Sequence, residues 1–277
     1  MKLSASLRIA ETFSDKRSSA MDLQEFAKIA KRSGYSAVCM RASQLGIQTH
    51  LEEVREKKEI LNTLGLAVSM VTGDFPIPEN HDQKGPEALR NISPYLDLAE
   101  TLGCDLLRIC MKSEDDIPWA QVAADAARER NITIAHQCHT KSLFERVDRA
   151  IQVIKSVGRS NFGIIYEPAN LELCGQDYGR RTIESLQPYI KNVYLQNQVL
   201  ERAGMDIIDT WTRGSVAFNQ IPMWQSGGVD FPLIIGVLND IGYSGYVTVH
   251  QAFGGLSGAE EAVVNSARYL RSIGEFE

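Results

Sequence analysis

The chain has 277 residues, of which 44% are hydrophobic, and its formal net charge is −6. This much apolar sequence supports a large buried core and excludes a disordered chain. The acidic balance gives no electrostatic basis for binding nucleic acid, and no apolar run is long enough to predict a membrane span. Five scattered cysteines without a C-x-x-C pair indicate thiols in a reducing compartment, so we expect a cytoplasmic protein.

Strand-like and helix-like segments alternate eight times along the chain. The predicted strands are Leu3–Ile9, Tyr35–Arg41, Ala67–Thr72, Leu106–Met111, Ile132–His139, Phe162–Glu167, Asn192–Gln196 and Tyr246–Gln251. The predicted helices are Asp22–Arg32, Leu51–Leu64, Pro86–Leu102, Ala120–Glu129, Leu143–Val157, Tyr178–Leu186, Phe231–Ile241 and Ala259–Ile273. Eight such repeats predict a (β/α)8 TIM barrel that forms a single domain over residues 1–277. A doubly wound open sheet is the alternative, but no glycine-rich phosphate turn follows the first strand.

The longest predicted connection runs from Gln198 to Asp230, after the seventh strand, and contains Trp211 and Trp224. Loops of this length in a compact domain are usually functional or mobile. Two interpretations stay open. The segment is either a lid over a substrate or a loop whose tryptophans only pack against the rest of the domain.

The sixth predicted strand ends in a carboxylate. It is a short apolar run from Phe162 to Tyr166, followed by Glu167 and Pro168. Proline cannot donate to a strand ladder, so the strand should stop there and leave Glu167 at its carboxyl end. Parallel α/β folds place their chemistry at that end, although a structural salt bridge is the alternative role for Glu167.

Strand alternation predicts which other side chains reach the same mouth. In the last strand the valines suit the helix side, so His250 should point inward at the end. In the fifth strand we place Gln137 and His139 inside, which makes His136 a structural, helix-side residue. The same parity puts Arg41 and Arg108 inside, either to hold substrate oxygens or to pair with Glu167 or Glu11. The resulting nitrogen and oxygen groups suit a transition metal, or general acid–base catalysis without a metal.

Four motifs of the chain are familiar. They are Ile134-Ala135-His136-Gln137-Cys138-His139, Tyr166-Glu167-Pro168-Ala169-Asn170-Leu171, Asn192-Val193-Tyr194-Leu195-Gln196-Asn197, and Gly228-Val229-Asp230-Phe231 followed by Gly242-Tyr243-Ser244-Gly245-Tyr246. With these motifs the chain resembles the xylose isomerase-like TIM-barrel superfamily, the sugar phosphate isomerase/epimerase and AP endonuclease family 2 group.

The resemblance implies a metal site that this chain has altered. Many members hold one divalent metal with acidic residues and a histidine, at positions that match Gln137, Glu167, Tyr194 and His250. Only Glu167 keeps the family's chemistry, because two anionic ligands are exchanged for neutral ones. We therefore expect a divalent metal (Mn, Zn, Co or Mg), bound weakly or absent, with Glu167, His250 and Gln137 as its ligands.

The resemblance also implies residue roles. His139 is the expected proton-transfer base, with Glu167 and Tyr194 as the other catalytic groups. Arg41, Arg108, Gln196 and Trp224 are the expected contacts of a small sugar or keto-sugar substrate. The expected function is a sugar isomerase or epimerase that abstracts a proton next to a carbonyl. A lyase or dehydratase acting on a keto-glycoside or keto-polyol is one alternative. A non-catalytic sugar-binding barrel or complex subunit is another, and a homo-oligomer is left open.

Overall fold

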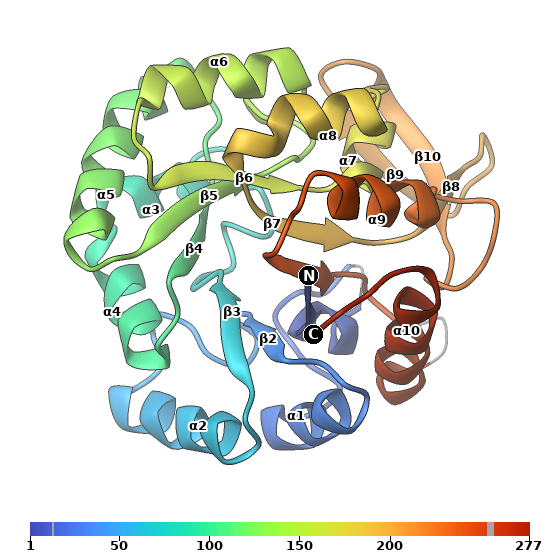
Figure 1. The fold of residues 1–277 in the computed structure, drawn as a ribbon. Coiled ribbons are helices and arrows are strands. Elements are labelled where there is room, and N and C mark those ends of the chain that lie inside the picture. The colour runs from blue at the N-terminus through green and yellow to red at the C-terminus, as the bar shows by residue number, and fades with distance from the viewer. Residues whose placement is uncertain (13, 254–257) are drawn as a thin grey trace.

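The computed structural model describes residues 1–12, 14–253 and 258–277. Within these ranges eight parallel strands close into a barrel in the order β1-β11-β7-β6-β5-β4-β3-β2 (Figure 1). The strands are β1 (Lys2–Ser6), β2 (Ala37–Met40), β3 (Ala67–Val71), β4 (Leu106–Ile109), β5 (Thr133–Gln137), β6 (Phe162–Tyr166), β7 (Ile190–Leu195) and β11 (Tyr246–Val249). The predicted (β/α)8 architecture is confirmed, with strand ends that differ by a few residues.

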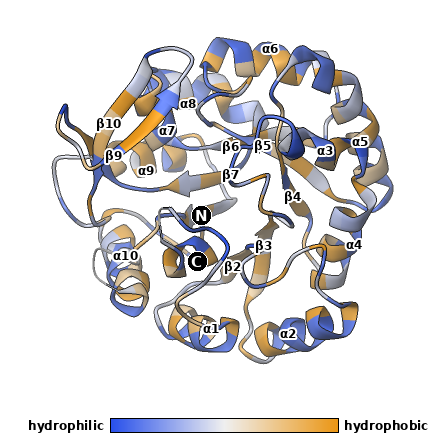
Figure 2. Cartoon of the chain, turned by 180° about the vertical axis from the view of Figure 1, so that it is seen from behind, coloured by the Kyte–Doolittle hydropathy of each residue, from blue (hydrophilic) through white to orange (hydrophobic). Residues whose placement is uncertain are grey.

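Helices surround the barrel and bury their apolar faces against it (Figure 1). The α-helices are α1 (Leu23–Arg32), α2 (Leu51–Thr63), α3 (Lys84–Arg90), α4 (Ser93–Leu102), α5 (Ile117–Glu129), α6 (Val147–Val157), α7 (Pro168–Leu173), α8 (Arg180–Leu186), α9 (Phe231–Asp240) and α10 (Ala259–Ile273), and the 3-10 turns are η1 (Leu7–Ala10), η2 (Glu114–Asp116) and η3 (Gln187–Tyr189). Figure 2 shows both hydrophilic and hydrophobic residues on each helix, as expected for helices that have one face in solvent and one face on the barrel. None of the described helices has the length and hydropathy needed to cross a bilayer.

The barrel interior is filled by side chains. One apolar layer contains Cys39, Met70, Leu106, Ala135, Ile165 and Tyr194, all buried. Polar side chains also lie inside, where the hydroxyls of Ser4 and Ser69 are 2.7 Å apart and Thr248 donates to Asn192 over 3.0 Å. Because this core is packed, a ligand can enter only above it, at the end of the strands.

The predicted helix over residues 86–102 is two helices, α3 and α4. Asn91 leaves the helical conformation, with φ −133° and ψ 61°. Pro94 then occupies the first turn of α4, where its missing N–H costs nothing. The apolar periodicity continues across the break, which is why the sequence suggested one helix.

The connection after β7 is not a plain loop. It folds into a three-stranded antiparallel sheet of β8 (Gln198–Leu200), β9 (Asp206–Thr210) and β10 (Gly214–Gln220), in the order β8-β10-β9. Val216 and Phe218 of β10 pack with Leu173 of α7. The small sheet is thereby anchored beside the carboxyl end of β6.

Candidate active site

A cavity of about 480 Å³ opens at the carboxyl ends of the barrel strands. Side chains at or just after the strand ends form its floor, and the small sheet supplies part of its wall. The floor residues are Arg8, Arg41, Arg108, Gln137, His139, Glu167, Gln196 and His250. Most of the polar residues selected by strand parity therefore converge on one cavity.

Glu167 is a buried carboxylate with one unpaired oxygen. It directly follows β6 and precedes Pro168, which starts α7, and only 1% of its surface is exposed. Its Oε2 accepts hydrogen bonds from the amides of Gln137 and Asn170. Its Oε1 is buried without a hydrogen-bond partner. The carboxylate is therefore held in place through one oxygen, and the other remains available for chemistry.

The pKa of Glu167 lies close to neutral pH. Burial raises the pKa of this carboxyl from 4.5 to about 7, against the opposing effects of the Gln137 hydrogen bond and the Arg108 charge. Burial is the dominant influence because an ionised carboxylate loses its hydration inside the barrel. A carboxyl with this pKa can accept a proton and release it again near pH 7.

Both histidines of the cavity are electrically neutral near pH 7. Burial and the nearby Arg108 charge lower the pKa of His139 well below 6.5. Burial and the Arg41 charge do the same for His250, whose Nδ1 lies 3.0 Å from the Ser6 hydroxyl. Neutral imidazoles in this position can exchange hydrogen bonds with substrate hydroxyls, but they are weak bases.

Five cationic side chains line the cavity, and one of them, Lys141, pairs with Asp209. The other four come from the first half of the chain. Arg8 comes from η1, Lys16 from the following connection, Arg41 from just after β2 and Arg108 from β4, and all of them line the cavity. We call these residues the cationic cluster. The arginines are 6%, 1% and 3% exposed, in chain order, and Arg8 and Arg41 both form ion pairs with the buried Glu11. The alternative that an inward arginine pairs with Glu11 therefore holds for Arg41.

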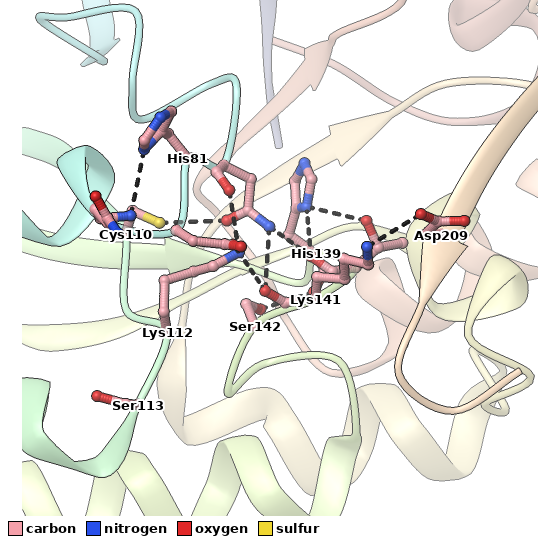
Figure 3. Close-up of polar contacts among 12 residues, drawn as sticks. His81, Cys110, Lys112, Ser113, His139, Lys141, Ser142 and Asp209 are labelled. Carbon is pink, nitrogen blue, oxygen red and sulfur yellow. Dashed lines mark hydrogen bonds and ion pairs between the residues drawn. The ribbon is translucent and has the colours of Figure 1, made fainter. Parts of the chain in front are cut away.

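The rim beside His139 is braced by polar contacts (Figure 3). His139 Nδ1 lies 3.0 Å from the carbonyl oxygen of Thr140. Lys141 reaches across to Asp209 of β9 with a 3.0 Å ion pair. Lys112 donates to the backbone carbonyls of Asn80 and Lys141. These contacts join the loops after β3, β4 and β5 to the small sheet.

Two predicted site residues do not line the cavity. Tyr194 is fully buried one layer deeper, where its ring stacks on His250 at 3.7 Å and its hydroxyl lies 3.2 Å from Cys39 Sγ. Trp224 stacks on Phe253, with ring centroids 6.0 Å apart. Both side chains, Tyr194 expected as a catalytic group and Trp224 as a substrate contact, are engaged in packing outside the cavity lining. His136 stacks on Phe144, as a structural helix-side residue should.

Sequence reasoning missed Arg8, Lys16 and Asn170. Arg8 continues the alternation of Ser4 and Ser6, so strand parity applied to the first strand would have found it. Asn170 lies three residues after Glu167, a spacing that puts both on one face of α7. Lys16 belongs to an irregular connection, and no periodicity marks it.

The predicted ligand set does not fit a divalent cation. Glu167 is its one carboxylate, and Oε2 is already occupied by the amide groups of Gln137 and Asn170. In the parts of the chain that the structure describes, no three His, Cys, Asp or Glu side chains are grouped to hold a metal. The cationic cluster would also repel a metal ion at such short range. The chemistry proposed below therefore uses none.

Comparison with protein families gives a clear match. The model described as xylose isomerase-like TIM barrel matches residues 27–273. No curated protein matches the chain significantly.

Solved structures share the fold at low identity. The probable 3-DHS dehydratase AsbF from Bacillus anthracis aligns with a TM-score of 0.75 and 13% identity, covering 98% of this chain and 99% of that one. D-allulose 3-epimerase from Methylomonas sp. aligns with a TM-score of 0.69 and 14% identity, covering 98% and 97%. A xylose isomerase-like TIM barrel protein from Mycobacterium smegmatis, in complex with magnesium, aligns with a TM-score of 0.66 and 14% identity, covering 98% and 96%. At these identities the likeness shows the fold alone.

Proposed function

The chain belongs to the xylose isomerase-like TIM barrel family, and from that premise we propose that it is an enzyme that enolises a small hydroxy-carbonyl compound. Glu167 is the general base that removes the proton from the carbon next to the carbonyl. The observation that supports this role is the buried, unpartnered Oε1 in a carboxyl whose pKa is about 7. Dehydratases and epimerases among the structural neighbours are compatible with such a step.

The residues around Glu167 orient the base, stabilise the enolate and bind a substrate hydroxyl. Gln137 and Asn170 fix Oε2, so that Oε1 keeps one direction. When the proton moves to Glu167, the electron pair of the C–H bond becomes an enolate, and its oxygen needs positive charge nearby. Arg108 is the candidate source of that charge, since within the cluster it has the largest electrostatic effect on the pKa of Glu167. The neutral His139 accepts a hydrogen bond from a substrate hydroxyl.

Return of the proton from Glu167 to the neighbouring carbon of the enediolate gives isomerisation. Epimerisation needs a proton delivered to the opposite face of the same carbon by a second donor. Elimination of a β-hydroxyl from the same enolate is the second candidate. Lys16 supports it, because burial and the neighbouring arginines lower the pKa of its ammonium to about 7, which suits a proton donor to a leaving hydroxide. Product analysis by NMR distinguishes the two outcomes.

The enolisation step is tested by exchange of substrate hydrogen with deuterated water. A panel of keto-sugars, sugar acids, sugar phosphates and keto-polyols is incubated with the enzyme and followed by proton NMR. Exchange at one carbon next to a carbonyl is expected for at least one class of compound. Binding of a compound without any exchange would favour the non-catalytic barrel instead.

The exchange rate should depend on the ionisation of Glu167. The base is active only when deprotonated, so kcat/KM should rise as the pH increases through about 7 and then level off. Burial raises the pKa to this value, against the opposing effects of Gln137, Arg108, Arg8 and Asn170. The profile is best measured in Lys16→Met, because Lys16 titrates in the same range. A profile that is flat below pH 7 would contradict Glu167 as the base.

A further inference from the structure

We propose that the cationic cluster binds an anionic group of the substrate, a carboxylate or a phosphate, and takes the role that a divalent cation has elsewhere. This inference rests on the proposed function for the identity of the reacting end. It adds the class of substrate, which is an anionic hydroxy-carbonyl compound.

The four cations of the cluster have two buried carboxylates close by, Glu11 and Glu167. Glu11 is shared between Arg8 and Arg41, as a single carboxylate for two guanidinium groups. Within the described residues, the structure shows no ion pair to Arg108, and the ammonium of Lys16 donates to the carbonyl oxygen of Pro78 at 2.9 Å. A surplus of buried charge is costly to a folded chain unless something compensates it. A bound anion would supply that compensation.

Buried donors of the cluster lack partners. Nη1 of Arg41 and Nε of Arg108 are both shielded from solvent and make no hydrogen bond. A buried donor without an acceptor costs about 1–3 kcal/mol in general, and more when it is charged. Guanidinium groups present paired N–H donors that match the oxygens of a carboxylate or phosphate. The unpartnered atoms therefore point to an oxyanion ligand.

Apolar side chains of the same cavity indicate the rest of the ligand. Ile207 and Ile208 of β9, Phe218 of β10 and Leu173 of α7 also line the cavity. The lining thus combines cationic and apolar side chains, which suits a small molecule with one anionic group. At about 480 Å³ the cavity accommodates one such molecule, as pockets for small ligands do.

Binding measured without turnover tests the inference. Isothermal titration at constant ionic strength compares D-glucose with D-gluconate, D-glucose 6-phosphate and inorganic phosphate. We expect the anions to bind at least about 10-fold more tightly than glucose, since one charge-assisted hydrogen bond contributes about 1.5–3 kcal/mol. If only gluconate binds more tightly than glucose, the site is specific for a carboxylate. If only the two phosphate compounds do, it is specific for a phosphate.

Variants show whether the cluster is responsible. Arg108→Met should remove at least about 10-fold of the anion affinity, a larger loss than for glucose. Arg128→Met, the same charge change on the exposed face of α5, is the matched control and should have no effect on either ligand. If Arg108→Met fails to fold, Lys16→Met makes the same comparison from the connection that follows η1.

The outcomes separate this inference from the proposed function. The anion site would be overturned if glucose and the anions bound with equal affinity. It would also be overturned if anion binding were unchanged in both cluster variants. Either result would hold even if a neutral sugar exchanged hydrogen. Tight anion binding without exchange of any compound would leave the anion site intact and overturn the enzyme.

Discussion

Replacing Glu167 with glutamine is expected to lower the rate of substrate hydrogen exchange about 10²–10⁴-fold, the usual contribution of one general base. Glutamine keeps the shape of the side chain and an oxygen that can accept from Gln137 and Asn170. It cannot take a proton from carbon. The measurement is exchange in deuterated water at saturating substrate. Glu172→Gln, the same change on α7 outside the cavity lining, is the control and should stay within about two-fold of wild type.

The same variant should not lose stability. The pKa of Glu167 is higher in the folded chain than in the unfolded one, so its contribution to stability is present below pH 4.5 and is lost as the pH rises to about 7. Glutamine has no charge to bury. At pH 8 the Tm of Glu167→Gln should therefore equal or exceed that of wild type. An inactive variant with a much lower Tm would indicate a structural role for the carboxylate rather than a catalytic one.

Glu11→Gln is expected to destabilise the fold by about 3–5 kcal/mol, the usual cost of breaking a buried ion pair. Glu11 is fully buried between Arg8 and Arg41, and its Oε1 also accepts from the hydroxyl of Ser43 at 2.6 Å. Neutralising it removes the negative charge that the two buried guanidinium groups share. The free energy of unfolding is measured in urea, provided that the transition is two-state.

Glu79→Gln is the matched control for this effect. Glu79 pairs with Arg17 at 3.2 Å on the surface, where the arginine side chain is 62% exposed, so its loss should cost about 0–1 kcal/mol. Adding Arg41→Met to Glu11→Gln should restore part of the lost stability, because it removes one uncompensated cation. A Glu11→Gln protein within about 1 kcal/mol of wild type would show that solvent or another group compensates the arginines.

Periodicity accounts for most of what the sequence could predict. The apolar runs and the helical spacing predicted all eight barrel strands, and the inward parity of each strand end placed Gln137, His139, Arg108 and His250 in one cavity. Parity gives the side of a strand but not the depth at which a side chain lies. Tyr194 points inward as predicted, yet it lies one layer below the floor, under His250.

Residues outside the regular elements were harder to predict. Arg8 lies in η1, just after the ladder of β1 ends, and Glu11 and Lys16 follow in an irregular connection. No repeat pattern marks Glu11 and Lys16, and only the folded chain brings them beside Arg41 and Arg108, whereas Arg8 follows the parity of Ser4 and Ser6. The small sheet lies in a stretch that the sequence predicted to be a loop, although β10 has seven residues and Gly214, with φ 69°, closes a hairpin between β9 and β10.

The family resemblance suggested a metal, and the assembled residues suggest instead a carboxylate base among fixed cations. A divalent ion would need anionic ligands, whereas the predicted ligand set has one carboxylate, Glu167, which is held by amides, and three arginines line the same cavity. The two accounts make opposite predictions about chelators.

The central claim is tested most directly by the exchange of substrate hydrogen with deuterated water in enzyme that has been dialysed against excess EDTA. The exchange rate at pH 8 is expected to equal that of untreated enzyme, and added Mn²⁺, Zn²⁺, Co²⁺ or Mg²⁺ should not raise it. Loss of exchange after chelation, with recovery on adding one of these ions, would contradict the claim that Glu167 and the cationic cluster act without a metal.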